Sequence, residues 1–269
     1  IKESKHKYIV KDIRKETLDV VTLKIKMENE SIPPFISGQF ITVYFPETGT
    51  PEGKSYSISS APHEETLNIT IKAMGEFSNR LCNMKKGDII TASLPYGFFF
   101  SESDNTDLVL LSAGIGIAPF RSIIQDVISK KPSRKIWLYC SNRTTEDIIF
   151  GKELIDLENK NPSLKIKHFI TRQKAISSNT SPNKSSEKSS SKSPDNMTLR
   201  RIDVKSIIED IGSSSNKSLN KSSEKSSSKL PDKEYFICGS ISFVRDIWRD
   251  LRENNIPEES IYTEAFFSH

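Results

Sequence analysis

Hydrophobic positions change their spacing about one third of the way along this 269-residue chain. Up to about residue 103, short segments alternate apolar and polar side chains, which is typical of half-buried strands. Five segments fit this pattern and are expected to be strands: 20–26, 40–45, 55–59, 67–72 and 89–92. Proline and glycine turns separate them, and many short strands of this kind favour a closed antiparallel β-barrel.

From about residue 104, continuous apolar runs alternate with segments of helical spacing. The runs predict strands at 108–111, 136–140, 165–170 and 235–238, and the spacing predicts helices at 121–129, 146–157, 204–211 and 243–254. This alternation predicts a parallel sheet with helices on both faces. The expected fold is therefore an antiparallel β-barrel over residues 1–103, followed by an α/β domain over residues 104–269.

Two Ser/Lys tracts interrupt the second half of the chain. Residues 181–195 and 218–232 differ at only two of their fifteen positions. Such segments bury too little apolar area to fold, so we expect disordered loop insertions at 176–196 and 213–232. The tracts also carry most of the net charge of +4, which leaves the folded part nearly neutral. Since no basic patch with interleaved aromatic residues is present, nucleic-acid binding is not predicted.

The remaining composition excludes several classes of site. Cys82, Cys140 and Cys238 are far apart, which argues against an iron–sulfur centre and against a disulfide scaffold. The four histidines show no ligand spacing, so no metal is assigned. No apolar run has membrane-spanning length. These features favour a soluble protein of a reducing compartment, either the cytoplasm or an organelle stroma or matrix, although any targeting segment before Ile1 would be invisible.

A glycine turn follows the apolar run at 108–111. Gly114 and Gly116 allow a sharp turn and a close approach to a ligand, and Pro119 is tolerated in a first helical turn. The free N–H groups of such a helix N-terminus suit a pyrophosphate. Because glycine turns also occur in folds that bind no nucleotide, the turn alone does not identify one.

Two motifs in the same order resemble those of the ferredoxin–NADP reductase superfamily. Residues 114–122, Gly-Ile-Gly-Ile-Ala-Pro-Phe-Arg-Ser, resemble its nicotinamide-nucleotide turn, and residues 54–57, Lys-Ser-Tyr-Ser, resemble its Arg-x-Tyr-Ser flavin motif. Further similar segments are Gly-Gln-Phe at 38–40, Pro-Tyr-Gly-Phe-Phe at 95–99, Cys-Gly-Ser at 238–240 and the Glu-x-aromatic end at 264–266. The resemblance covers nearly the whole chain outside the tracts.

The resemblance implies an FAD site. In the family the tyrosine packs on the isoalloxazine, here Tyr56, and the following serine, Ser57, bonds near the flavin N5. Lys54 replaces the usual arginine and so lacks its planar two-pronged fork. A Gly-x-x-Ser turn, with Ser78 expected as the helix N-cap, holds the pyrophosphate. The implied FAD-binding residues are Lys54, Ser55, Tyr56, Ser57, Lys72, Gly75, Phe77, Ser78 and Phe266. Which of Phe266 and Phe267 covers the flavin stays open.

The resemblance also implies an NAD(P) site at the carboxyl ends of the parallel strands, where open α/β sheets bind ligands. Thr171 and Arg172 lie where relatives hold the 2′-phosphate, which favours NADPH over NADH, and Arg143 is a second candidate. Arg143 could equally form a loop ion pair with Asp147. The implied residues are Gly114, Gly116, Ile117, Ala118, Pro119, Arg143, Thr171, Arg172, Cys238 and Gly239.

Together the motifs predict a catalytic site where Ser57, Cys238 and Glu264 converge. The predicted function is hydride transfer from NADPH or NADH to FAD, followed by electron transfer to a ferredoxin-like protein, an oxygenase component or another redox protein. One alternative is a flavin reductase that uses flavin as a dissociable substrate, which Lys54 keeps open. The other is a non-catalytic interaction module on the same fold.

Overall fold

The computed structural model describes residues 4–45, 47, 49–103, 105–172, 197–216 and 233–266. The predicted insertion at 176–196 and most of that at 213–232 lie outside these residues. Residues 213–216 of the second predicted insertion lie inside them, at the end of helix α4, Val204–Asn216. Buried Ile207 and Ile211 anchor this helix, and a serine-rich last turn costs little once the helix has formed.

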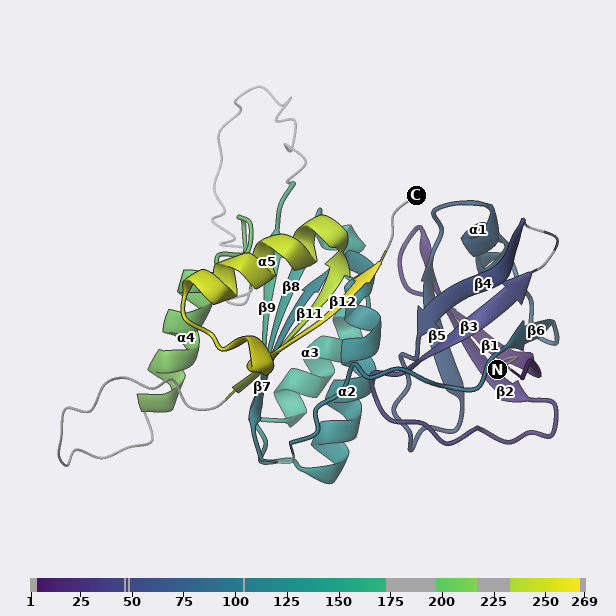
Figure 1. Cartoon of the computed structure of the whole chain (residues 1–269), viewed down its shortest axis with the longest axis horizontal. Coiled ribbons are helices and arrows are strands. Elements are labelled where there is room, and N and C mark those ends of the chain that lie inside the picture. The colour runs from purple at the N-terminus through teal and green to yellow at the C-terminus, as the bar shows by residue number, and fades with distance from the viewer. Residues whose placement is uncertain are drawn as a thin grey trace, which may run out of the picture.

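The first half of the chain forms an antiparallel six-stranded sheet in the order β4-β3-β6-β1-β2-β5. Its strands are β1 His6–Lys15, β2 Val20–Met27, β3 Phe40–Phe45, β4 Thr50–Ser57, β5 Leu67–Lys72 and β6 Ile89–Ala92. A bridge between Ile58 and Ile69 joins the end of β4 to β5 and closes the sheet. The predicted barrel is confirmed (Figure 1).

The strand pattern missed β1, although it is the longest strand described in the barrel. Tyr8 and Val10 point into the core, but a bulge between Val10 and Asp12 shifts the register before Ile13. A bulge inserts one residue and so breaks the period-two pattern on which strand prediction depends. Charged side chains fill most of the remaining positions of β1.

The second half forms a parallel six-stranded sheet in the order β10-β9-β8-β7-β11-β12. Its strands are β7 Asp107–Ala113, β8 Ile136–Asn142, β9 Leu164–Ile170, β10 Met197–Thr198, β11 Lys233–Ser240 and β12 Ile261–Phe266. The predicted α/β architecture is confirmed. The sheet ends with two strands that the apolar runs did not reveal, β10 and β12. Edge strands are buried less than central ones, and β12 has only intermediate and exposed positions.

Helices cover both faces of the parallel sheet (Figure 1). They are α2 Ile117–Lys130 and α3 Gly151–Lys160 on one face, and α4 and α5 Ile241–Glu253 on the other, while α1 Glu76–Cys82 packs on the barrel. Three-residue 3₁₀ turns occur at Gly114–Gly116, Thr145–Asp147 and Glu258–Ser260. The predicted helix at 146–157 was wrong at its start, because Phe150 takes a left-handed φ of 60° and separates the 3₁₀ turn from α3.

Aromatic residues after the barrel pack against the second domain. Phe99 lies 5.8 Å from Phe120 and 5.3 Å from Phe236, measured between ring centroids, so it is part of the packed core of the second domain. Phe98 beside it takes no part in this packing, because it is 90% exposed. Among the residues described, no helix is both long enough and apolar enough to cross a membrane.

Candidate active site

The glycine turn lies at the carboxyl edge of the parallel sheet, between β7 and α2. Gly114 has a left-handed φ of 53°. At Gly116 a Cβ would lie only 2.1 Å from the carbonyl oxygen of Cys238. At Gly239 a Cβ would lie 3.0 Å from the Cβ atom of Ala113. Glycine is therefore required where the end of β11 approaches the turn. Apart from its chain neighbours, no atom of the described residues lies within 4 Å of a Cβ built on Gly114, so the outer side of the turn is open.

Next to this turn, the structure brings together the three residues predicted to be catalytic. Cys238 on β11 and Glu264 on β12 are register partners in the parallel sheet. Ser57 ends β4 of the barrel, and its hydroxyl donates a hydrogen bond of 3.0 Å to Oε1 of Glu264. Three segments that are far apart in sequence thus meet across the boundary between the two domains, although their catalytic roles stay predictions.

Burial controls the charge of this cluster. It raises the pKa of Glu264 from 4.5 to about 7, while the Ser57 hydrogen bond acts in the opposite direction. The second oxygen of Glu264, Oε2, is buried without a hydrogen-bond partner among the residues described. Burial raises the pKa of Cys238 well above its usual value, and the Glu264 carboxylate adds to the effect. Cys238 is therefore a neutral, fully buried thiol near pH 7, and it is not a nucleophile.

The predicted flavin motif, residues 54–57, forms the last part of β4 and lies beside α1. The ring of Tyr56 stacks on that of Phe77, with centroids 6.3 Å apart, and Lys54 Nζ lies 5.7 Å above the same Phe77 ring. Phe77 is only 3% exposed and belongs to the barrel core. The hydroxyl of Ser55 lies on the exposed side and bonds Thr42 Oγ1 at 3.2 Å. Burial raises the pKa of Tyr56, so its phenol is neutral.

The predicted capping of α1 was wrong. The helix begins at Glu76 with Gly75 as the N-cap, and Ser78 is its third residue. The Ser78 hydroxyl reaches back and accepts hydrogen bonds from the N–H groups of Met74, at 2.9 Å, and Gly75, at 3.1 Å. Serine occurs both as a cap and at the third position of a capping box, so its presence did not fix the helix start. Lys72, also assigned to FAD, forms an ion pair with Asp19 at 3.2 Å.

The two arginine candidates lie at adjacent strand ends. The N–H and hydroxyl of Thr171, after β9, both donate to the carbonyl of Asn142, at 2.9 and 3.2 Å. The N–H of Arg172 donates to the carbonyl of Arg143 at 2.7 Å. Both arginines are exposed. The Asp147 carboxylate accepts instead from the N–H and hydroxyl of Thr144.

The remaining predicted residues lie close to these groups. Ile117, Ala118 and Pro119 form the buried first turn of α2, and Phe266 ends β12 opposite Ser240. Phe267 lies outside the described residues. Arg121 and Ser122 belong to the turn motif at 114–122, but the sequence predicted no role for them. Both side chains are buried at the domain boundary. The signal that could have found them is a charged residue on the apolar face of a helix.

Comparison with known proteins fits this geometry. The family described as the oxidoreductase NAD-binding domain matches residues 110–249, which is half of the chain. The chain belongs to the ferredoxin–NADP reductase superfamily. A flavohemoprotein of Bacillus subtilis (strain 168) is 30% identical to this superfamily member over 144 residues, or 52% of this chain and 36% of that protein.

Two solved structures resemble this ferredoxin–NADP reductase superfamily member over nearly its whole length. The flavohem-like FAD/NAD-binding domain of nitric oxide dioxygenase from Vibrio cholerae O1 biovar El Tor has a TM-score of 0.73 at 18% identity, covering 97% of this chain and 98% of that one. A ferredoxin NADP⁺ reductase from Neisseria gonorrhoeae with bound FAD and NADP has a TM-score of 0.69 at 21% identity, covering 99% and 100%. At these identities the likeness shows the fold.

The chain is shorter than the curated relatives that it matches. The matched segments cover 36%, 54% and 59% of three flavohemoproteins, from Bacillus subtilis, Chromobacterium violaceum and Dictyostelium discoideum. What those whole proteins do is therefore a separate question from what this reductase-family chain does.

Proposed function

We propose that this chain is a reductase unit that takes hydride from NAD(P)H onto FAD and delivers electrons to a separate redox protein. The observation that carries the proposal is the 3.0 Å contact between Ser57 of the barrel and Glu264 of the α/β domain, with Cys238 on the neighbouring strand. Family membership supports the same reaction class.

The residues present fit a flavin at the domain boundary. Lys54, Ser55, Tyr56 and Ser57 follow one another on β4, and the N-terminus of α1 lies beside them at Gly75, where a Cβ would meet no atom within 4 Å. Oε2 of Glu264 has no hydrogen-bond partner in the described part of the chain, and it is the kind of buried polar atom that a bound group satisfies. FAD, when bound, supplies the redox chemistry, since it accepts a hydride and gives up its electrons onward.

The protein's part is orientation and proton handling. A carboxyl group with a pKa of about 7 can hold or release a proton near neutral pH. The Ser57 hydroxyl donates to Oε1 of Glu264, so it can pass its proton to that carboxylate while its own oxygen accepts another from a bound group. Cys238 is neutral, so it adds no charge to the site.

The strand ends of β8 and β9 support NADPH as the preferred donor. Arg143 and Arg172 are both exposed, and a hydrogen bond joins their backbones. Their side chains therefore start close together, so that both guanidinium groups can reach one phosphate. The open turn at Gly114 provides the site for the pyrophosphate. The proposed acceptor is a ferredoxin-like protein or an oxygenase component, because relatives of this chain include a ferredoxin–NADP reductase and a dioxygenase reductase component.

A second candidate is a flavin reductase that binds flavin only as a substrate. It is favoured by Lys54, whose ammonium lies over the Phe77 ring and lacks the fork with which arginine grips a phosphate. The absorbance spectrum of the purified protein after gel filtration separates the two proposals. A reductase unit retains a flavin spectrum that NADPH bleaches under anaerobic conditions, and NADH bleaches it less readily. Protein without flavin that nevertheless oxidises NADPH with added FAD supports the second candidate, and no NAD(P)H oxidation with FAD added contradicts both.

A further inference from the structure

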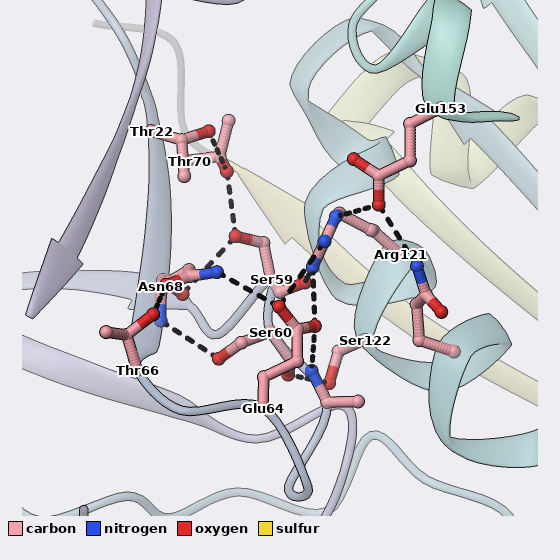
Figure 2. A network of polar contacts seen from close by, with 12 residues as sticks. Thr22, Ser59, Ser60, Glu64, Thr66, Asn68, Thr70, Arg121, Ser122 and Glu153 are labelled. Atoms are coloured by element: carbon pink, nitrogen blue, oxygen red, sulfur yellow. Dashed lines mark hydrogen bonds and ion pairs between the residues drawn. The ribbon is translucent and has the colours of Figure 1, made fainter. Parts of the chain in front are cut away.

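Within the proposed function, we infer that Arg121 is a positioning residue. Its guanidinium clamps the two domains so that Ser57 stays against Glu264. Arg121 lies in the first turns of α2, on the same motif as the nucleotide turn, but it points toward the barrel (Figure 2). Its contacts, its burial and its place in the sequence each support this role.

The guanidinium binds both domains at once. Nη1 donates to the carbonyl of Ser59, at 2.6 Å, and to Glu64 Oε1, at 2.8 Å, while Nη2 lies 3.4 Å from Glu64 Oε2. Ser59 and Glu64 belong to the barrel. On the other side, Nε lies 2.7 Å from Oε1 of Glu153, on α3 of the α/β domain. Nη1 and Nη2 are hydrogen-bonded to the barrel, whereas Nε is at ion-pair distance from Glu153 but makes no hydrogen bond among the described residues. Two carboxylates thus already balance the charge of the guanidinium, and a nucleotide phosphate is not its ligand here.

The carboxylates that hold Arg121 are themselves fixed. Glu64 Oε1 also accepts from the N–H of Ala61 at 2.8 Å. Glu153 Oε2 lies 3.1 Å from the guanidinium of Arg14, on β1 of the barrel. Arg14, Glu153, Arg121 and Glu64 therefore form a chain of alternating charge that crosses the domain boundary twice. Arg121 is the buried member of this chain, whereas Glu64 and Glu153 are partly exposed, at 24% and 21%. Removing both carboxylate contacts would leave a buried guanidinium without its balancing charges, which is costly.

The neighbouring residue adds a second link in the same direction. The hydroxyl of Ser122 donates to the carbonyl of Ser60 at 2.6 Å, and both serines are fully buried. Ser60 in turn accepts from the N–H of Asn68 on β5, and Ser59 bonds Thr70 of the same strand (Figure 2). The clamp is thus connected to the hydrogen-bond network of the barrel.

The clamp holds both sides of the proposed reaction site. Ser59 and Ser60 are the second and third residues after Ser57, and Arg121 follows Gly116, which touches Cys238, by five residues. Arg121 lines two open pockets at the domain boundary, of about 600 and 390 Å³, so side-chain packing is incomplete on this side. Polar contacts therefore contribute to the domain orientation here, beside the aromatic packing of Phe99. A shift of about 1 Å in reacting groups can cost about a hundredfold in rate.

The test compares two arginines that are buried alike. Arg121→Lys keeps the charge but cannot span Glu64 and Glu153, because an ammonium lacks the fork. Arg134→Lys is the control, since Arg134 has a 7% exposed side chain, against 8% for Arg121. Arg134 pairs with Glu234 and also donates to Ser101 and to the Thr106 carbonyl on the connecting segment, and it contacts neither Glu64 nor Glu153. We expect Arg121→Lys to keep its FAD and its melting curve but to lose about 10- to 100-fold in the rate of flavin reduction at saturating NADPH. Arg134→Lys should reduce its flavin at the parent rate.

A double-substitution cycle separates positioning from general damage. Glu64→Gln retains an oxygen for the Ala61 N–H but removes the charge that Arg121 binds. We expect Glu64→Gln in the Arg121→Lys background to cause little further loss, because the shared contact is already gone. If the two losses multiply, or if Arg121→Lys reduces its flavin at the parent rate, the inference is overturned. If Arg121→Lys loses its FAD, the inference is tested with the single variant Glu64→Gln. Flavin reduction by Glu64→Gln at the parent rate then overturns the inference.

Amide hydrogen exchange provides a readout that does not need activity. Loss of the clamp should raise exchange in residues 58–66 and 117–125 for Arg121→Lys but not for Arg134→Lys. Should the parent protein show no flavin reduction, the proposed function fails, and this exchange difference still tests the clamp. Equal exchange in both variants contradicts it.

Discussion

Glu264→Gln should make the protein more stable above neutral pH while it makes the site less active. Burial raises the pKa of Glu264 to about 7 from its usual 4.5. The folded value thus lies about 2.5 above the unfolded one, and at 1.36 kcal/mol for each pH unit the ionised carboxylate costs about 3 kcal/mol of folding stability. Glutamine has nearly the same shape, can accept the Ser57 hydrogen bond and does not ionise.

The pH window follows from the direction of the pKa change. Below about pH 4.5 the carboxyl is protonated in both states, so it costs nothing. As the pH rises toward 7, the unfolded chain releases this proton while the folded protein keeps it, so stability is lost across this interval. Above about pH 7 the loss is complete. The variant should therefore match the parent near pH 4.5 and exceed it by about 3 kcal/mol at pH 8.

Urea unfolding followed by circular dichroism, at several pH values and a fixed FAD concentration, measures this difference. Glu258→Gln, at an exposed position beside β12, controls for the loss of a surface charge. If the stability difference between Glu264→Gln and the parent is the same at pH 5 and pH 8, then the buried-carboxyl argument is wrong. Slower flavin reduction by the same variant would show that the costly carboxyl is retained for chemistry.

Three further substitutions test other parts of the site. Tyr56→Ala should weaken FAD retention by about 1 kcal/mol or more, through lost ring stacking, and an unchanged flavin content after gel filtration would count against the placement. Arg172→Ala should raise the KM for NADPH and leave that for NADH almost unchanged, whereas equal changes would reject a 2′-phosphate role. Gly116→Ala should lower the melting temperature and displace Cys238, because its Cβ would lie 2.1 Å from a carbonyl oxygen, and parent-like melting and flavin reduction would refute that close approach.

Local patterns predicted the architecture because, in most strands and helices, apolar residues recur at the spacing typical of that element. They failed where the backbone departs from that period. The bulge in β1 breaks the alternation, Phe150 interrupts a helical pattern with a left-handed residue, and Ser78 bonds backward from inside α1. None of these backbone features follows from residue type alone.

The meeting of Ser57, Cys238 and Glu264 could be predicted, because each lies in a motif that resembles one of the superfamily, and the resemblance implies that these motifs share one site. The Arg121 clamp could not be predicted in the same way. Its partner Glu64 is 57 residues distant, and no local spacing connects the two. Pairs of this kind depend on the relative orientation of the two domains, which local sequence patterns do not encode.

Anaerobic stopped-flow reduction by NADPH tests the central claim most directly, namely that hydride transfer takes place where Ser57, Cys238 and Glu264 meet. Cys238→Ala and Glu264→Ala should both retain FAD, because neither residue lies in the flavin motif of β4. Their flavin should nevertheless be reduced at least about tenfold more slowly than in the parent, since both changes alter the geometry of the transition state. If both variants are reduced as fast as the parent, the nicotinamide binds elsewhere and this site is wrong.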